Sequence, residues 1–445
     1  MILFQDIEYV DNGRRQRGDI LVDQKDIVRI EEPGTIPCPA SAKVVRGAEG
    51  MLLLPGVIDE HVHSREPGML YKGNLTSETK AAAAGGVTSI LDMPNVNPPT
   101  TTLDRLAQRF ELGSQHAYVN YSFYFGATNK NTAMLPRLNP MKVPAVKLFM
   151  GSSTGGMLVD RGESLHAVFE LSPLPIMTHC EDSDIIAENL QRAKELYGDD
   201  PDVAHHPEIR SREACVRSSN LAAELARRYE KQLHIAHVTT AEELSLAYES
   251  KTSPTRITLE ACVPHLLFCD EDYQQLGTRI KCNPSVKTRR DRDALRAALS
   301  DGRITTIATD HAPHLLSEKQ GGCAKAASGM PMVQFSLPSM LQLVDEGALT
   351  LERMVELMCH HPADYFSISD RGYIQEGYRA DLVLVQQKPW QLTKDLIVSH
   401  CGWSPLEGRS FNWKVISTYC NGHRIYHEGV FADGNSHAER LLFNR

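Results

Sequence analysis

Histidine and aspartate residues follow several short apolar runs of this chain, and their side chains are typical metal ligands. They are His61, His63, His179, His237 and Asp310. Imidazole nitrogens and carboxylate oxygens bind Zn²⁺ and similar divalent ions. The pair His61 and His63 is weak evidence alone, although in a strand both side chains would project from one face. Ligand-type residues after four separate runs predict a catalytic metal centre.

Lys147 lies inside the apolar run Val146–Met150, where an unpaired ammonium would be costly. Taken alone, it would be read as a snorkelling or ion-paired lysine. Beside two dications, burial and positive charge would lower its pKa, and a neutral amine can add CO₂ to form a carbamate. We therefore expect two Zn²⁺ per chain, bridged by a CO₂-derived carbamate on Lys147 and held by the five residues named above.

The elements that must position these residues are apolar runs of strand length, which alternate with helix-length amphipathic segments. Such alternation is typical of βα units around a parallel sheet. Helices are predicted at Thr76–Ala84, before Gly85-Gly86, and at Ser211–Tyr229. The runs are Leu52–Ile58, Val87–Leu91, Asn120–Phe125, Ala145–Phe149, Pro175–Met177, Leu233–Ala236, Ile257–Ala261 and Ile304–Ala308. Eight units predict an α/β fold, a (β/α)₈ barrel with its site at the carboxyl ends of the strands.

Both ends of the chain read as short strands and tight turns. Asp11-Asn12-Gly13 and Asn421-Gly422 are hairpin signals, and Gly18–Val22 and Ala380–Val385 have strand composition. We predict a small β-sandwich domain built from residues 1–51 and 369–445, around a barrel of residues 52–368.

Several motifs resemble the dihydroorotase family of the amidohydrolase superfamily over nearly the whole chain. The stretch Pro55–Gly68 is similar to the first-strand signature, in which an arginine follows H-x-H. Met93-Pro94-Asn95 and Lys281-Cys282-Asn283-Pro284 resemble its substrate-binding asparagine segments. Ala308–His314 resembles the signature of strand eight. Family members carry either a carboxylated lysine or an aspartate where Lys147 stands.

The resemblance implies reversible hydrolysis of (S)-dihydroorotate to N-carbamoyl-L-aspartate in de novo pyrimidine biosynthesis. A metal-bridged hydroxide would attack the ring, with Asp310 as general base and acid. The implied substrate-binding residues are Arg65, Asn95, Asn283, His314, Ser328 and Gly329. Arg65, with Asn95, would hold the substrate carboxylate. The alternatives are an allantoinase, a dihydropyrimidinase or hydantoinase, or a non-catalytic scaffold protein.

Two further segments allow more than one interpretation. The small-residue stretch 151–156 could form a mobile lid or a plain surface loop. Glu260 and His265, after the seventh run, could support the metal ligands, but we favour ordinary polar packing for both.

Composition narrows the classes of partner. The chain is 42% hydrophobic and 23% charged, which is typical of a globular protein rather than a disordered one. The formal charge is −9 and no Lys/Arg-rich run is present, so nucleic acid is not an expected partner. We see neither a signal peptide nor a membrane span, nor a C-x-x-C pair among ten cysteines, which predicts a cytoplasmic protein with reduced thiols. We expect a small-molecule substrate and, as a candidate assembly, a homodimer.

Overall fold

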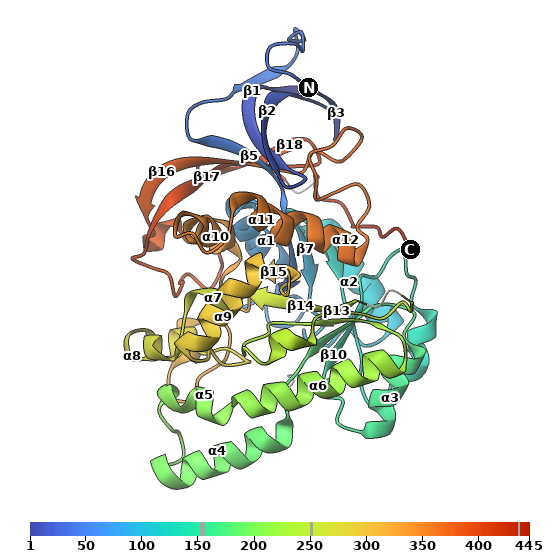
Figure 1. Cartoon of the computed structure of the whole chain (residues 1–445), viewed down its shortest axis with the longest axis vertical. Helices are drawn as coiled ribbons and strands as arrows, with labels where there is room; N and C mark the ends of the chain where they lie inside the picture. Colours follow the sequence, from blue (N-terminus) through green and yellow to red (C-terminus); the bar gives the residue numbers. More distant parts are fainter. Residues whose placement is uncertain (152–155, 250–251, 435–436) are drawn as a thin grey trace.

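Eight parallel strands form a barrel in the computed structural model, which describes residues 1–151, 156–249, 252–434 and 437–445 (Figure 1). In chain order they are β6 (Val57–Val62), β7 (Val87–Asp92), β8 (Asn120–Phe123) continued by β9 (Phe125–Gly126), β10 (Val146–Phe149), β11 (Ile176–His179), β12 (Gln232–Ile235), β14 (Arg256–Cys262) and β15 (Thr306–Ala308). Each pairs with the next, and a parallel bridge between Val62 and His311 joins the last strand region to the first. The predicted α/β barrel is confirmed.

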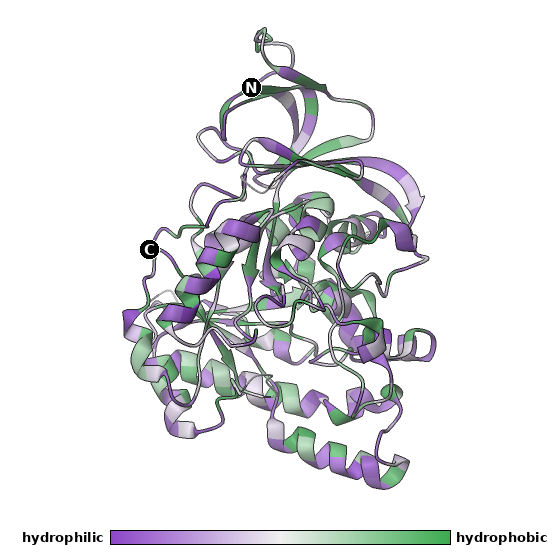
Figure 2. Cartoon of the chain, turned by 180° about the vertical axis from the view of Figure 1, so that it is seen from behind, coloured by the Kyte–Doolittle hydropathy of each residue, from purple (hydrophilic) through white to green (hydrophobic). Residues whose placement is uncertain are grey.

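Helices surround these strands, with their apolar faces turned toward them. The longer ones are α1 (Leu75–Ala84), α2 (Leu103–His116), α3 (Gly162–Leu171), α4 (Ser183–Tyr197), α6 (Arg212–Arg228), α9 (Arg289–Ser300) and α10 (Ser336–Asp345). Shorter ones are α5 (His206–Ile209), α7 (Val263–Leu267), α8 (Tyr273–Leu276), α11 (Leu351–Val355) and α12 (His361–Phe366). Figure 2 shows apolar barrel strands inside helices that carry mixed apolar and polar surfaces.

The two helices predicted from the sequence are present, and their ends have clear chemical causes. The side chain of Asn74 accepts a hydrogen bond from the main chain of Ser77 at the start of α1, which ends at Gly85. The Ser211 side chain caps α6 in the same way, through the main chain of Ala214. Within the described residues, no helix has the length and apolar run that a membrane crossing requires.

The two ends of the chain meet in one curled sheet, as predicted. Its order is β19 (Val430–Phe431), β18 (His423–His427), β17 (Ser410–Cys420), β16 (Leu382–Gln391), β5 (Met51–Pro55), β1 (Ile2–Asp11), β2 (Arg14–Asp23) and β3 (Asp26–Glu31), with β4 (Lys43–Arg46) beside β1. The hairpin turns use Asn12 and Gly13, and Asn421 and Gly422, all with positive φ between 49° and 74°. That conformation matches the twist of the flanking strands.

The interpretation of Leu52–Ile58 as the first barrel strand is wrong in its first part. Met51–Pro55 (β5) pairs with β16 and β1 in the terminal sheet, and the barrel strand β6 begins at Val57. Both strands have the same buried apolar composition, so their pattern alone does not separate them. The division of the chain into residues 1–51, 52–368 and 369–445 stays a prediction.

The amino end of the barrel is filled by side chains from α12 and the carboxyl-terminal segment. Leu441 and Phe443 are buried with Tyr365 and Phe366 against barrel residues that include Tyr124. This plug leaves the opposite end of the barrel, where the strands finish, as the open one.

Candidate metal centre

A cavity of about 340 Å³ lies at the carboxyl ends of the barrel strands. Every residue predicted to bind metal or substrate lines it. They are His61, His63, Arg65, Asn95, Lys147, His179, His237, Asn283, Asp310, His314, Ser328 and Gly329. Met69, Lys72 and Phe149 also line the cavity, although their sequence context did not predict a place at the site.

A bulge in β6 sets the direction of the first histidines. Asp59 pairs with Ile90 and Val62 with Asp92, so three steps of β6 oppose two steps of β7. Such an extra residue re-aims the side chains that follow it. Glu60 and His61, although adjacent in sequence, therefore both contact groups inside the barrel.

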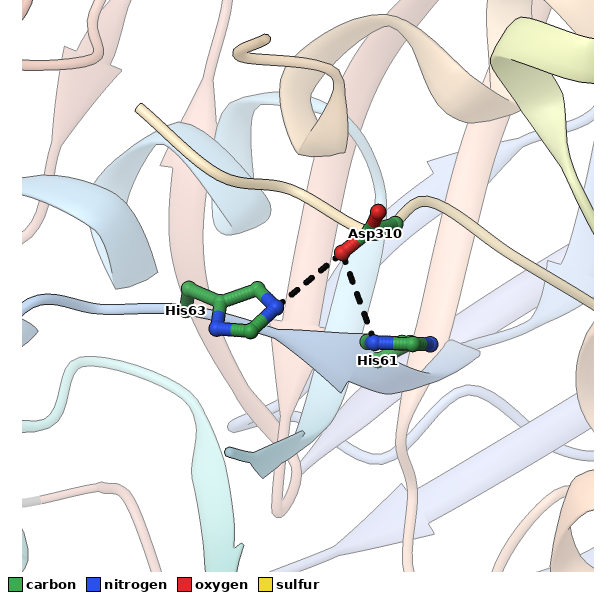
Figure 3. A group of neighbouring side chains, drawn as sticks. All are labelled: His61, His63 and Asp310. Atoms are coloured by element: carbon green, nitrogen blue, oxygen red, sulfur yellow. Dashed lines mark hydrogen bonds and ion pairs between the residues drawn. The ribbon is translucent and has the colours of Figure 1, made fainter. Parts of the chain in front are cut away.

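His61 and His63 converge on Asp310 (Figure 3). Their Nε2 atoms lie 3.4 Å and 3.0 Å from Oδ1 of Asp310. The other ring nitrogen of each histidine faces a side-chain oxygen, since His61 Nδ1 is 2.8 Å from Glu260 Oε1 and His63 Nδ1 is 2.9 Å from Asn95 Oδ1. If the Nδ1 atoms donate there, both Nε2 atoms present lone pairs to a carboxylate oxygen. Acceptors that face one another in this way fit a cation between them.

His179 and His237 form the second half of the site. His179 Nε2 lies 2.8 Å from Glu181 Oε2, so its Nδ1 carries the lone pair, and this atom is 3.0 Å from His237 Nε2. Nearby, the buried Lys147 Nζ has no hydrogen-bond partner in the described part of the chain. Burial lowers the pKa of Lys147 to about 8. The ring nitrogens of His179 and His237 and the amine of Lys147 fit the ligand set of a second divalent ion.

The site favours the ligand forms of its titratable groups. Burial lowers the pKa of His63 to about 4, and it also lowers the pKa of His179 and His237. Burial alone would raise the pKa of Asp310, but His61, His63 and Lys147 hold it well below its usual value. Neutral imidazoles and an ionised carboxylate are the species that bind metal.

Three residues at the same strand ends have a strained backbone. Arg65, His237 and Asp310 have φ of 71°, 37° and 47°, in the left-handed region that favours glycine. Each such residue costs about 1–3 kcal/mol, and positions of this kind gather at functional sites. The side chains of these three residues all line the cavity, so this backbone strain lies at the candidate site.

Two carboxylates that hold the candidate ligands were not assigned this role from the sequence. Glu181 contacts His179 and forms a buried ion pair with Arg210. Glu260 contacts His61 Nδ1 and accepts from the main chain of His237 at 2.8 Å, so the interpretation of Glu260 as ordinary packing is wrong. Glu181 follows His179 by two residues, and this H-x-E spacing was the available signal.

His265 contacts the carbonyl oxygen of Pro284 at 3.1 Å, which agrees with ordinary packing. Most of the candidate lid lies outside the described residues, which end at Gly151 and resume at Gly156.

Arg65 lines the same cavity as the candidate metal ligands. Its guanidinium is buried, and Nε donates to the carbonyl oxygen of Pro313 at 2.9 Å. Among residues 1–151, 156–249, 252–434 and 437–445, no hydrogen-bond or ion-pair partner is recorded for its two terminal nitrogens. A buried guanidinium with such donors suits an anionic ligand.

Two other predicted substrate-binding residues are held by hydrogen bonds within the protein. Asn283 accepts from His206 Nε2 at 3.2 Å, and the main-chain N–H of Gly329 donates to the carbonyl oxygen of Lys281.

The chain is similar in sequence and in fold to known proteins. The sequence profile of the amidohydrolase family matches residues 52–425. A dihydroorotase of Methanosarcina mazei is 32% identical over 409 residues, which cover 89% of this chain and 88% of that protein. An allantoinase of Bacillus velezensis is 28% identical over 434 residues, 96% and 94% of the two chains. The solved structure of an L-hydantoinase (dihydropyrimidinase) from Arthrobacter aurescens superposes with a TM-score of 0.93 at 25% identity, over 99% of both chains.

Proposed function

Because the chain belongs to the amidohydrolase family, we propose that it acts as a dihydroorotase. It would interconvert (S)-dihydroorotate and N-carbamoyl-L-aspartate, a step of de novo pyrimidine biosynthesis. The similarity to dihydroorotases of Methanosarcina mazei and Pyrococcus furiosus, both at 32% identity, supports this choice within the family.

The observation that carries the proposal is the guanidinium of Arg65 in the same cavity as the candidate metal ligands. An arginine does not lose its charge in a protein, and a buried charge needs a partner. Dihydroorotate carries a carboxylate on its ring, which a guanidinium can bind through two parallel hydrogen bonds. The rings of dihydrouracil, hydantoin and allantoin carry no such group.

We assign two Zn²⁺ ions to the site. His61, His63 and Asp310 would hold one, His179 and His237 the other, and a carbamate on Lys147 would bridge them. When bound, such a pair lowers the pKa of water toward neutrality and polarises a carbonyl.

Side chains of the protein carry out the proton transfer and bind the substrate. An Asp310 carboxylate oxygen takes the proton of the attacking water and returns it to the ring nitrogen as the amide bond breaks. The lowered pKa of Asp310 keeps this carboxylate ionised, which is the form that can accept a proton. Arg65 and Asn95 hold the substrate carboxylate, the main chain of Ser328 and Gly329 holds the ring, and Asn283 and His314 complete the pocket. In the biosynthetic direction the same groups close the ring.

A neutral cyclic amide is the second candidate substrate, because the allantoinase and the L-hydantoinase are also similar over nearly their whole lengths. Steady-state assays of the purified protein on dihydroorotate, dihydrouracil, hydantoin and allantoin separate the two. A preference for dihydroorotate supports the proposal, and a preference for any of the three uncharged rings replaces it.

The proposed enzyme would work in the cytoplasm on a small molecule, with neither nucleic acid nor a membrane as partner, and with a homodimer as the candidate assembly. A complete lack of turnover with loaded metal would favour the scaffold alternative.

A further inference from the structure

Lys72 lines the cavity beside His314, on the side of Arg65. It is 7% exposed, and its Nζ lies 3.0 Å from His314 Nδ1 and 2.8 Å from Glu318 Oε1. None of the roles assigned above involves this lysine.

The contact determines which nitrogen of His314 carries the proton. An ammonium has three donors and no acceptor, so Nδ1 must accept and the ring proton must sit on Nε2. A competing contact, Nδ1 to Glu318 Oε2, is 3.6 Å long, beyond the range of a hydrogen bond. Burial, Arg65 and Lys72 together lower the pKa of His314, so the ring is neutral.

Glu318 holds the lysine in place. Its Oε2 accepts from the main chain of Leu315 at 2.9 Å, while its Oε1 pairs with Lys72. The carboxylate is thus fixed to the backbone one residue after His314. This ion pair gives the buried ammonium of Lys72 a charged partner of opposite sign.

We propose that Lys72 is a positioning residue that locks His314 in its Nε2–H tautomer and thereby makes it a hydrogen-bond donor to an anionic substrate. The proposal rests on the proposed function for the identity of that anion. In the described part of the chain no partner is recorded for Nε2 of His314, and the side chain lines the cavity. With the other tautomer, Nε2 would present a lone pair and repel a carboxylate. Lys72 would therefore favour an anionic ring over a neutral one.

The tautomer can be measured without substrate. Long-range ¹H–¹⁵N NMR of protein labelled with ¹⁵N-histidine reports which ring nitrogen bears the proton, and His314→Gln assigns the signal. We expect His314 to carry Nε2–H in the wild type and in Lys72→Arg, which is also a pure donor. In Lys72→Met a population with Nδ1–H should appear. An Nδ1–H ring in the wild type, or an unchanged ring in Lys72→Met, would overturn the proposal.

Kinetics test the consequence. Lys72→Met should raise KM for dihydroorotate about tenfold, as expected for one lost charge-assisted hydrogen bond, with a smaller change in kcat. Lys72→Arg should restore most of the loss, and Lys72→Met should add little to His314→Ala. Lys388→Met, at an exposed position of β16, is the matched control. Additive losses, or no rescue by arginine, would contradict the proposal.

The two measurements separate this proposal from the proposed function. If the wild type does not use dihydroorotate, the dihydroorotase assignment fails, while the NMR spectrum still decides whether Lys72 fixes the tautomer.

Discussion

Glu260 Oε1 lies 2.8 Å from His61 Nδ1, across the barrel between β14 and β6, and both side chains are buried. The same oxygen accepts a hydrogen bond from the main chain of His237. One carboxylate therefore orients a candidate ligand in each half of the metal centre. Although burial disfavours its charge, His61 and His234 hold the pKa of Glu260 below its usual value.

Glu260→Gln should weaken metal binding about 10–100-fold. A carboxylate both orients the His61 ring and makes its imidazole a more basic ligand, and a neutral amide does each of these less well. Metal affinity is measured by competition with a chelator, and kcat is measured at saturating metal. Glu224→Gln, on the exposed face of α6, is the control and should bind metal as the wild type does. Equal affinities in the two variants would show that Glu260 has no such role.

Arg65→Met should leave the fold and the metal content intact but reduce kcat/KM for dihydroorotate on the order of a hundredfold. This corresponds to a loss of a few kcal/mol of transition-state stabilisation, because the charged partner of the carboxylate is removed. Dihydrouracil, if it is turned over, should be barely affected. The measurement is steady-state kinetics on both rings, with circular dichroism as the check on folding. An equal loss on both substrates would refute the carboxylate assignment.

Elemental analysis of carefully prepared, fully active protein should give two divalent ions per chain, because the candidate ligands exceed the set of one tetrahedral zinc. Removal with a chelator should abolish activity, and added Zn²⁺ should restore it. Full activity with about one ion per chain would rule out the paired site.

Lys147→Ala should lose metal and activity together, and short carboxylic acids should restore part of both by replacing the carbamate oxygens. The pKa of Lys147 near 8 also predicts a pH effect in metal-free protein. Below this pH the amine is protonated and cannot add CO₂, whereas above it the amine is neutral. Reactivation by Zn²⁺ and bicarbonate should therefore speed up as pH rises through 8, and normal activity of Lys147→Ala would exclude the bridge.

Phe443→Ala should destabilise the protein by about 3–5 kcal/mol, since it empties part of the plug at the amino end of the barrel. Its neighbour offers a matched control, because Phe443 is 1% exposed and Leu442 is 53% exposed. Urea unfolding of Leu442→Ala should follow that of the wild type. Similar midpoints for both variants would show that the plug contributes little.

Local patterns in the sequence predicted the barrel and the candidate metal ligands that line the cavity. His61, His63, His179, His237 and Asp310 each stand at the end of an apolar run, and barrel geometry brings strand ends together. The boundary between β5 and β6 was missed because a sheet strand and a barrel strand of the same composition look alike.

Contacts between distant residues could not be predicted in this way. Lys72 meets His314 only because β6 and β15 are neighbours in the closed barrel, and the spacing of either residue gives no sign of the other. The contact of Glu260 with His61 depends on the bulge in β6, which a strict alternation of side chains along the strand does not predict.

The pairing of β5 with β16 constrains how the protein is assembled. Pro55 pairs with Leu382, so the whole barrel is synthesised between the two partners. Contacts over such a separation form slowly, because the loop between them must close first. Strand β6, which carries His61 and ends just before His63, follows β5 directly. The pairing of β5 with β16 can therefore hold it in place only after the carboxyl-terminal segment has been synthesised. Metal uptake is therefore expected late in folding, after most of the barrel has formed.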